Sequence, residues 1–354
     1  MATVLNPVRS GADILGQLLR RQQVLTRFAL ALLLLLVPVL VASMIDTRTL
    51  DGVSVWAKPT KFLFSIAVHV LTFAWFVGYV RSDQRETPWM RCVVGVLIAA
   101  NIFELAWIGW QAAHGLHSHF NYDTPFFGMM YALMGVAVLL IVGANIPLAW
   151  AIWRHPAGDL RPEYRAAVII GLLFTVVLGG GFGIYMSQQI GHAVGADTGH
   201  LPLFGWSRAG GDLRVAHFFG IHAEQAIPLL ALSVAGLKRA TRWVSILAGS
   251  AAYAGLTVAT FIQALEGRPF CPEGRAVVAR IAASRTDENI ANRSSVNGTS
   301  SRNRRVRLSR QPCRAIAPSA RLRRSRKHKE QGQGRSRAAV APGRRCRHIA
   351  ARTR

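Results

Sequence analysis

The stretch ALALLLLLVPVLVASMI, residues 29–45, carries no charged side chain and decides the class of this 354-residue chain. An α-helix needs about 20 mostly apolar residues to cross the ~30 Å hydrocarbon core of a bilayer. Six further stretches of this kind follow, at 62–80, 92–113, 129–153, 166–187, 215–236 and 243–265. We therefore expect an all-α fold, an integral membrane bundle of seven transmembrane helices.

The charge of the chain is divided unevenly. Residues 1–267 hold 18 Lys and Arg against 13 Asp and Glu, whereas residues 268–354 hold 24 against 4. The second segment has almost no apolar periodicity from which to build a core. We expect 1–28 to be a cytoplasmic N-terminal segment, 29–267 the transmembrane domain, and 268–354 a disordered, Arg-rich tail.

Two explanations of this tail stay open. A basic disordered segment would bind nucleic acid or lipid headgroups. Alternatively, its Arg, Ala, Ser, Gly and Pro content, with lysine only at Lys327 and Lys329, is typical of GC-rich DNA translated out of frame. Resequencing the gene decides, since an unchanged frame with normal codon bias would refute a frameshift. For residues 1–267 we expect no nucleic-acid partner, only the bilayer and a small ligand or ion.

The loops predict an orientation. Counting alternate segments from an N-terminus inside, the inner segments carry 13 basic residues and the outer ones carry 5. Cytoplasmic loops are enriched in Lys and Arg, so the N-terminus is expected in the cytoplasm and the end of the seventh span outside. The residues before the first span either lie along the membrane surface or begin that span.

Ionisable side chains inside the spans share one expected depth. At ~1.5 Å rise per residue, His69 lies about 10–12 Å from the outer end of its span, and Glu104 about 14 Å. His222 and Glu224 of the sixth span fall at about 10–14 Å. Ionisable groups in hydrocarbon cost about 2.5–3.5 kcal/mol and usually face the bundle interior, so we expect an outer-half polar cavity where these four side chains meet.

Several functions fit such a cavity. A carboxylate beside two imidazoles suits a divalent metal such as zinc. His69 and His222 could ligate one haem iron from opposite sides, in a membrane redox protein. The same groups could relay protons in a transporter. A hydrogen-bond network between helices, without any ligand, explains them as well.

A second group of histidines lies at the outer surface. His114 and His117 would share a helix face at i and i+3 if the third span continued. His119 and Asp123 could complete a site from the loop, and the next outer loop and the start of the sixth span add His192, Asp197, His200 and His217. Zinc, copper or nickel would suit these ligands, so His114, His117 and His119 are candidate metal ligands.

The glycine-rich run GGGFG, residues 179–183, permits close helix packing or local unwinding beside a cavity. Several protein classes are excluded by what the sequence lacks. No predicted span contains a lysine for a retinal Schiff base, and three in-membrane histidines are too few for a two-haem cytochrome. There is no HExxH, GxSxG or Walker sequence, and no catalytic residue can be named.

Two stretches, FELAWIGWQAAHGLHSHFN at 103–121 and RVAHFFGIHAEQAIP at 214–228, resemble uncharacterised polytopic inner-membrane proteins of rhizobia and related bacteria. The resemblance covers about residues 25–270. It implies a multi-pass protein of the bacterial inner membrane. Some rhizobial proteins of this kind are tied to nodulation efficiency, so the resemblance also allows a non-catalytic protein that affects host interaction. Our first expectation is a non-enzymatic membrane protein that binds an ion or small ligand for transport or sensing.

Overall fold

The computed structural model describes residues 11–158, 160–202 and 204–272. All of them belong to one compact unit, Met1–Ile290. The predicted tail lies outside the described residues except for 268–272, as does the beginning of the predicted N-terminal segment. Within the described ranges the chain is mostly helical, and six helices are long and apolar enough to span a membrane. A bent pair of helices raises that number to seven if it counts as one span.

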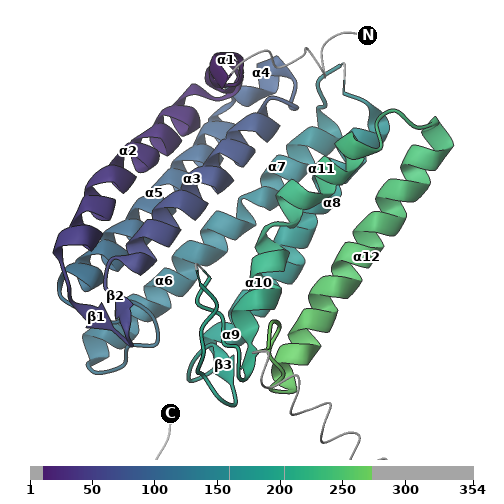
Figure 1. The fold of residues 1–354 in the computed structure, drawn as a ribbon. Coiled ribbons are helices and arrows are strands. Elements are labelled where there is room, and N and C mark those ends of the chain that lie inside the picture. The colour runs from purple at the N-terminus through teal and green to yellow at the C-terminus, as the bar shows by residue number, and fades with distance from the viewer. Residues whose placement is uncertain (1–10, 159, 203, 273–354) are drawn as a thin grey trace, which may run out of the picture. The chain divides into compact units, whose positions relative to one another are not determined.

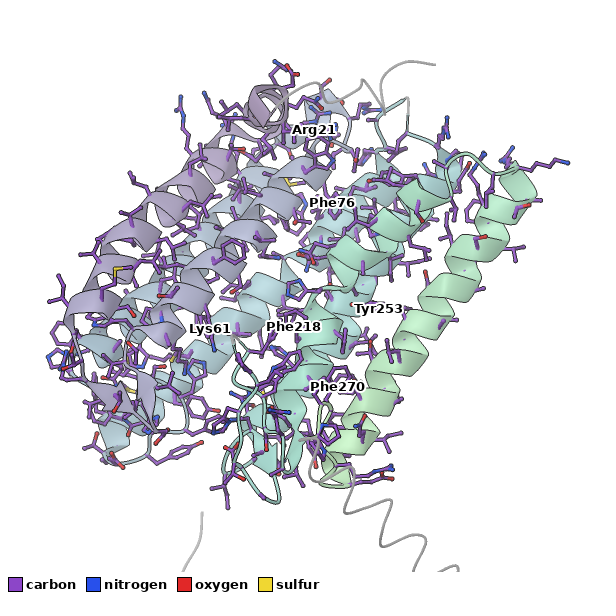
Figure 2. The ribbon with its side chains drawn as sticks, viewed as in Figure 1. Arg21, Lys61, Phe76, Phe218, Tyr253 and Phe270 are labelled. Atoms are coloured by element: carbon purple, nitrogen blue, oxygen red, sulfur yellow. The ribbon has the colours of Figure 1, made fainter. Side chains whose placement is uncertain are left out.

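The first helix is separate from the first span. α1 (Gly11–Arg21) ends before Gln22, whose extended backbone and side-chain oxygen cap α2 (Gln23–Ile45). In Figure 1, α1 is seen end-on while α2 runs in the plane of the picture. Arg21 holds α1 to α3, because its guanidinium donates to the Trp75 carbonyl at 2.9 Å and lies 4.1 Å from the Trp75 ring centre (Figure 2). α1 is therefore a separate helix and does not continue into α2.

The next two spans form one side of the bundle. After the two-stranded hairpin β1 (Thr49–Leu50) and β2 (Val53–Ser54), α3 (Ala57–Val77) packs against α2 and α5 (Pro88–Ala113). The short α4 (Ser82–Arg85) joins α3 to α5. α6 (Pro125–Gly143) and α7 (Asn145–Arg154) then make one 30-residue apolar segment.

The fifth span contains an irregular turn. α8 (Pro162–Phe174), the π-helix η1 (Thr175–Gly180) and α9 (Gly181–Ser187) follow without interruption. β3 (Ala193–Val194) and β4 (Gly211–Asp212) pair in the loop beyond. α10 (Leu213–Ile221) and α11 (Ala223–Ser233) are bent by 54° at His222, and α12 (Arg239–Leu265) follows.

In Figure 1 the bent pair runs from the end of the bundle that carries β3 to the end that carries α1 and α4. α10 contacts η1 and α12, while α11 contacts α8 and α12. The Tyr253 hydroxyl of α12 donates to the Phe219 carbonyl of α10 at 2.6 Å (Figure 2). Phe270, just past the predicted domain boundary, also packs on Trp206 and Phe219 of this part.

The spans begin earlier than their apolar cores predict. Thr87 and Thr124 accept hydrogen bonds from the first turns of α5 and α6, and each is followed by proline. A threonine N-cap and a proline at the first helical position favour a helix start without being part of an apolar run, so the apolar runs begin later than the helices. The earlier start of α3 matters most, because it places His69 about 18 Å along the helix from its outer end. His69 therefore lies near the middle of α3. Its expected depth in the outer half of the membrane stays a prediction.

Candidate functional site

The candidate site is built around the break between α10 and α11. Pro228 lacks the N–H that would bond to the Glu224 carbonyl, and its ring crowds that carbonyl, so the helix is weakened there. A hydroxyl from η1 substitutes for backbone partners. Thr175 Oγ1 donates to the Ile221 carbonyl at 3.3 Å and accepts from the Glu224 backbone N–H at 3.1 Å.

Glycines allow η1 to approach this break closely. A Cβ on Gly179 would lie 2.8 Å from the backbone nitrogen of Ile221, and one on Gly220 would lie 2.6 Å from the Gly179 Cα. Both distances are shorter than real Cβ contacts, so neither position accepts a side chain without moving the backbone. The close packing expected of the glycine-rich run is present, and the run also begins within the π-helix.

Glu224, at the start of α11, forms an ion pair with His69 of α3. Glu224 Oε1 lies 2.7 Å from His69 Nδ1, and the two side chains are 2 % and 17 % exposed. Gln225 Nε2 donates to the same oxygen at 2.8 Å, and Asn145 Nδ2 donates to Oε2 at 3.1 Å. The carboxylate is therefore surrounded by donors from three helices, which offset the cost of burying its charge.

His222 reaches this pair only indirectly. Its Nδ1 lies 3.2 Å from Gln225 Oε1, while Gln225 also donates to the Thr72 hydroxyl of α3 at 3.2 Å. The His222 ring packs on Phe218 with ring centres 4.3 Å apart. His217, introduced above with the outer histidines, donates its Nδ1 hydrogen to the Gly179 carbonyl at 2.8 Å.

Glu104 does not join the His69–Glu224 pair by any contact within the described ranges. It is 1 % exposed on α5, and neither of its carboxylate oxygens has a hydrogen-bond partner there. Asn101 and Gln111, on the same helix, each also carry one buried oxygen without a partner. The four residues predicted as one polar cavity thus separate into a connected group of three and Glu104, whose charge acts on Lys58 of α3.

Each of the histidines predicted at the outer surface makes a polar contact with a different residue. His114 Nδ1 lies 2.8 Å from the Trp110 carbonyl and His117 Nε2 lies 3.5 Å from Asp51. His119 Nδ1 lies 3.0 Å from the Lys58 ammonium, for which only an uncharged imidazole can be the acceptor. Burial, together with the charge of Lys58, lowers the pKa of His119 well below its usual value.

The predicted metal site at His114, His117 and His119 therefore stays a prediction, since the three rings have different partners in the structure. In the second loop, His192 and His200 each lie 3.7 Å from Asp197. Burial and the charge of Arg214 lower the pKa of His192. Throughout the part of the chain that the structure describes, no three His, Cys, Asp or Glu side chains are arranged to hold a metal ion.

Three further residues, which hydrogen-bond to Glu224 or His222, were not predicted, because the prediction considered ionisable side chains alone. Asn145 is the single amide in its predicted span, and that isolation was an available signal because polar groups in lipid are costly. Gln225 follows Glu224 directly. Thr175 carries no such signal, since threonine is common in membrane helices and its role depends on the π-helix.

No protein-family model, curated protein sequence or solved structure matches this chain.

Proposed function

We propose that this chain is a multi-pass protein of the bacterial inner membrane that takes up and releases a proton at the His69–Glu224 pair, for transport or sensing. One observation carries the proposal: a buried imidazole and carboxylate 2.7 Å apart at a break in a membrane helix. We count the bent pair α10–α11 as one crossing, which gives seven in all. The basic residues of the inner loops support an N-terminus in the cytoplasm.

The chemistry follows from the two side chains. Histidine is the side chain whose charge changes between about pH 5 and 8, and ionisable pairs inside membranes mark proton and ion pathways. Of the two side chains, His69 is the one whose ordinary charge change falls near neutral pH, so we assign the proton uptake and release to it. Broken helices place such sites near the middle of many transporters, because the two half-helices can move separately.

The test is to follow His69 directly. Purified protein in lipid nanodiscs, labelled with ¹⁵N-histidine, is titrated by NMR over about pH 5 to 8. We expect one titrating signal that disappears in His69→Gln and is perturbed in Glu224→Gln. Glu86→Gln, which removes a carboxylate 75 % exposed outside the membrane segments, is the matched control and leaves the signal unchanged. If no signal that titrates in this range is lost in His69→Gln, the proposal is refuted.

A membrane redox function is the second candidate, and one atom favours it. His69 Nε2 is buried without a partner in the described part of the chain, while Nδ1 bonds to a carboxylate. Metal-ligating histidines usually carry such a carboxylate on their other nitrogen. His69 would then hold the iron of a haem, which would supply one-electron chemistry. A visible haem band in the purified protein that is lost in His69→Gln would favour this function over proton uptake.

A further inference from the structure

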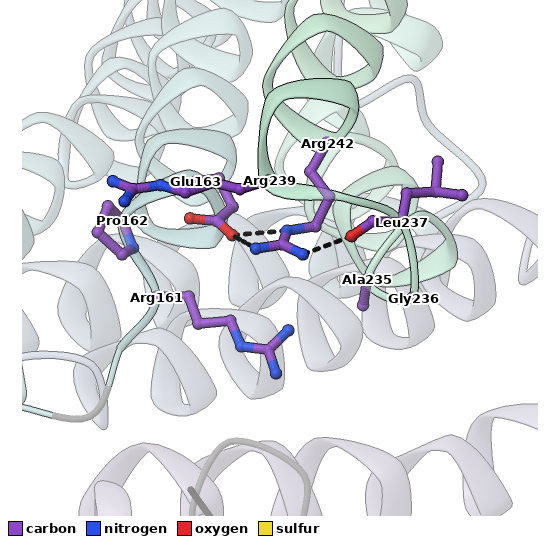
Figure 3. A pocket seen from close by; sticks show the side chains of 8 residues that line it. All are labelled: Arg161, Pro162, Glu163, Ala235, Gly236, Leu237, Arg239 and Arg242. Atoms are coloured by element: carbon purple, nitrogen blue, oxygen red, sulfur yellow. Dashed lines mark hydrogen bonds and ion pairs between the residues drawn. The ribbon is translucent and has the colours of Figure 1, made fainter.

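A basic groove lies at the end of the bundle where α8 and α12 begin, and neither His69 nor Glu224 is among its lining residues. Figure 3 shows its lining from close by. It is formed by the first residues of the two helices and by the chain that leaves α11: Arg161, Pro162, Glu163, Ala235, Gly236, Leu237, Arg239 and Arg242.

One of the three guanidinium groups is held in place. Arg242 Nε donates to Glu163 Oε1 at 2.6 Å, and its Nη1 donates to the Leu237 carbonyl at 2.5 Å. This ion pair offsets the charge of Glu163 and fixes the wall of the groove. Arg161 and Arg239 are exposed and form no ion pair within the described ranges, so the groove keeps an excess of two positive charges.

The backbone adds to this charge. The first turns of α8 and α12 both line the groove, and neither helix start has a side-chain cap bond. Unpaired N–H groups and the positive end of the helix dipole favour an anion at such a position. Two helix starts and three guanidinium groups therefore act on the same small volume.

The position of the groove selects the anion. The segment Pro162–Ser187, which begins with α8, and α12 are both long and apolar enough to span a membrane, so their first residues would lie where a span meets the headgroups. Leu237 and Val244, 45 % and 67 % exposed, offer apolar surface beside the groove. We propose that this groove binds the phosphate of an anionic phospholipid, whose acyl chains lie against α12.

This assignment needs only that α8 and α12 cross the bilayer, and it is independent of proton uptake at His69. Basic pockets between membrane helices bind anionic headgroups, at a gain of about 1 kcal/mol per Lys or Arg near the surface. Losing one of the two free guanidinium groups should therefore weaken lipid binding ~5-fold, and losing both ~25-fold.

The experiment measures lipid retention by native mass spectrometry. The full chain is purified with equal amounts of phosphatidylglycerol and phosphatidylcholine, and the affinity for each lipid is obtained by titration. We expect preference for phosphatidylglycerol in the unchanged protein and a ~25-fold loss in Arg161→Gln/Arg239→Gln. Arg161→Lys/Arg239→Lys keeps the charges and should keep most of the affinity.

Arg91→Gln is the matched control, because it removes one positive charge outside the groove lining. A loss in Arg91→Gln as large as in Arg239→Gln would overturn the proposal, since binding would then follow total charge. Displacement of phosphatidylglycerol by equimolar inorganic phosphate would also overturn it, in favour of a free-phosphate site. The melting temperature in phosphatidylcholine alone shows whether each variant is folded, and a variant that fails there is replaced by the lysine pair.

Discussion

Gly220→Ala is the sharpest test of the way α10 and η1 meet. A Cβ at Gly220 would lie 2.6 Å from the Gly179 Cα, whereas ordinary Cβ contacts begin at 3.4 Å. The two backbones must therefore separate by about 0.8 Å. Because the obstacle is backbone and not the end of a flexible side chain, overpacking of this kind costs about 1–3 kcal/mol.

The displacement also reaches the break. The Thr175 hydroxyl bonds to the Ile221 carbonyl at 3.3 Å and to the Glu224 N–H at 3.1 Å, and both distances would pass the limit of a hydrogen bond. Each lost bond costs about 1 kcal/mol. We therefore expect Gly220→Ala to lower the free energy of unfolding by about 3–5 kcal/mol in total.

The assay is thermal unfolding of purified protein in lipid nanodiscs. Gly181→Ala is the matched control, because it lies in α9, two residues from Gly179, and a Cβ there meets nothing within 4 Å. Alanine in a helix is more stable than glycine by about 0.5–1 kcal/mol, so this control should not lower the melting temperature. If Gly220→Ala melts with Gly181→Ala, the close approach is not a constraint and the reasoning fails.

Three further outcomes are expected. His69→Leu and Glu224→Leu should each destabilise the protein by about 3–5 kcal/mol, because each single change leaves the other side chain of the pair without its partner. The double variant should lose much less stability than the sum of the two. Additive losses in chemical denaturation would contradict an interaction between the two side chains. Glu104→Gln should lower the melting temperature, because it removes the negative charge that acts on the Lys58 ammonium, and an unchanged value would show that the two charges do not stabilise each other. The free energy of unfolding should decline as pH falls through about 6.5, because the His119 side chain takes up a proton more readily in the unfolded chain than in the folded one. His119→Asn should reduce this decline. If the melting temperature of His119→Asn falls with pH as steeply as that of the unchanged protein, this explanation is refuted.

The helical segments could be predicted from the sequence because lipid imposes one simple requirement, about 20 consecutive apolar residues. Their ends could not be predicted equally well. Thr87 with Pro88, and Thr124 with Pro125, begin helices outside the apolar runs through capping and a fixed backbone angle. α3, which carries His69, likewise begins at Ala57, five residues before the apolar stretch predicted at 62–80, although no side chain caps its start.

The site could be predicted in part, for a related reason. Ionisable residues in apolar spans are few, and three of the four chosen ones, His69, His222 and Glu224, lie in one connected group. Depth alone cannot say which way a side chain faces, so Glu104 was grouped with residues that it does not contact. The bend at His222 depends on Pro228 and on a hydroxyl from another helix, which periodicity within one span does not report.

The π-helix makes the number of residues between α8 and α9 matter as much as their identity. A π turn closes its hydrogen bonds between residues five apart instead of four, so it holds one residue more than an ordinary turn. If Thr175–Gly180 became a regular α-helix of the same length, the extra residue would no longer be absorbed, and everything beyond it would rotate by about 100°. Phe182 would then leave its stacking contact with Phe261, 4.3 Å away between ring centres. The stacking of Phe182 on Phe261 therefore depends on the π turn as well as on the two rings.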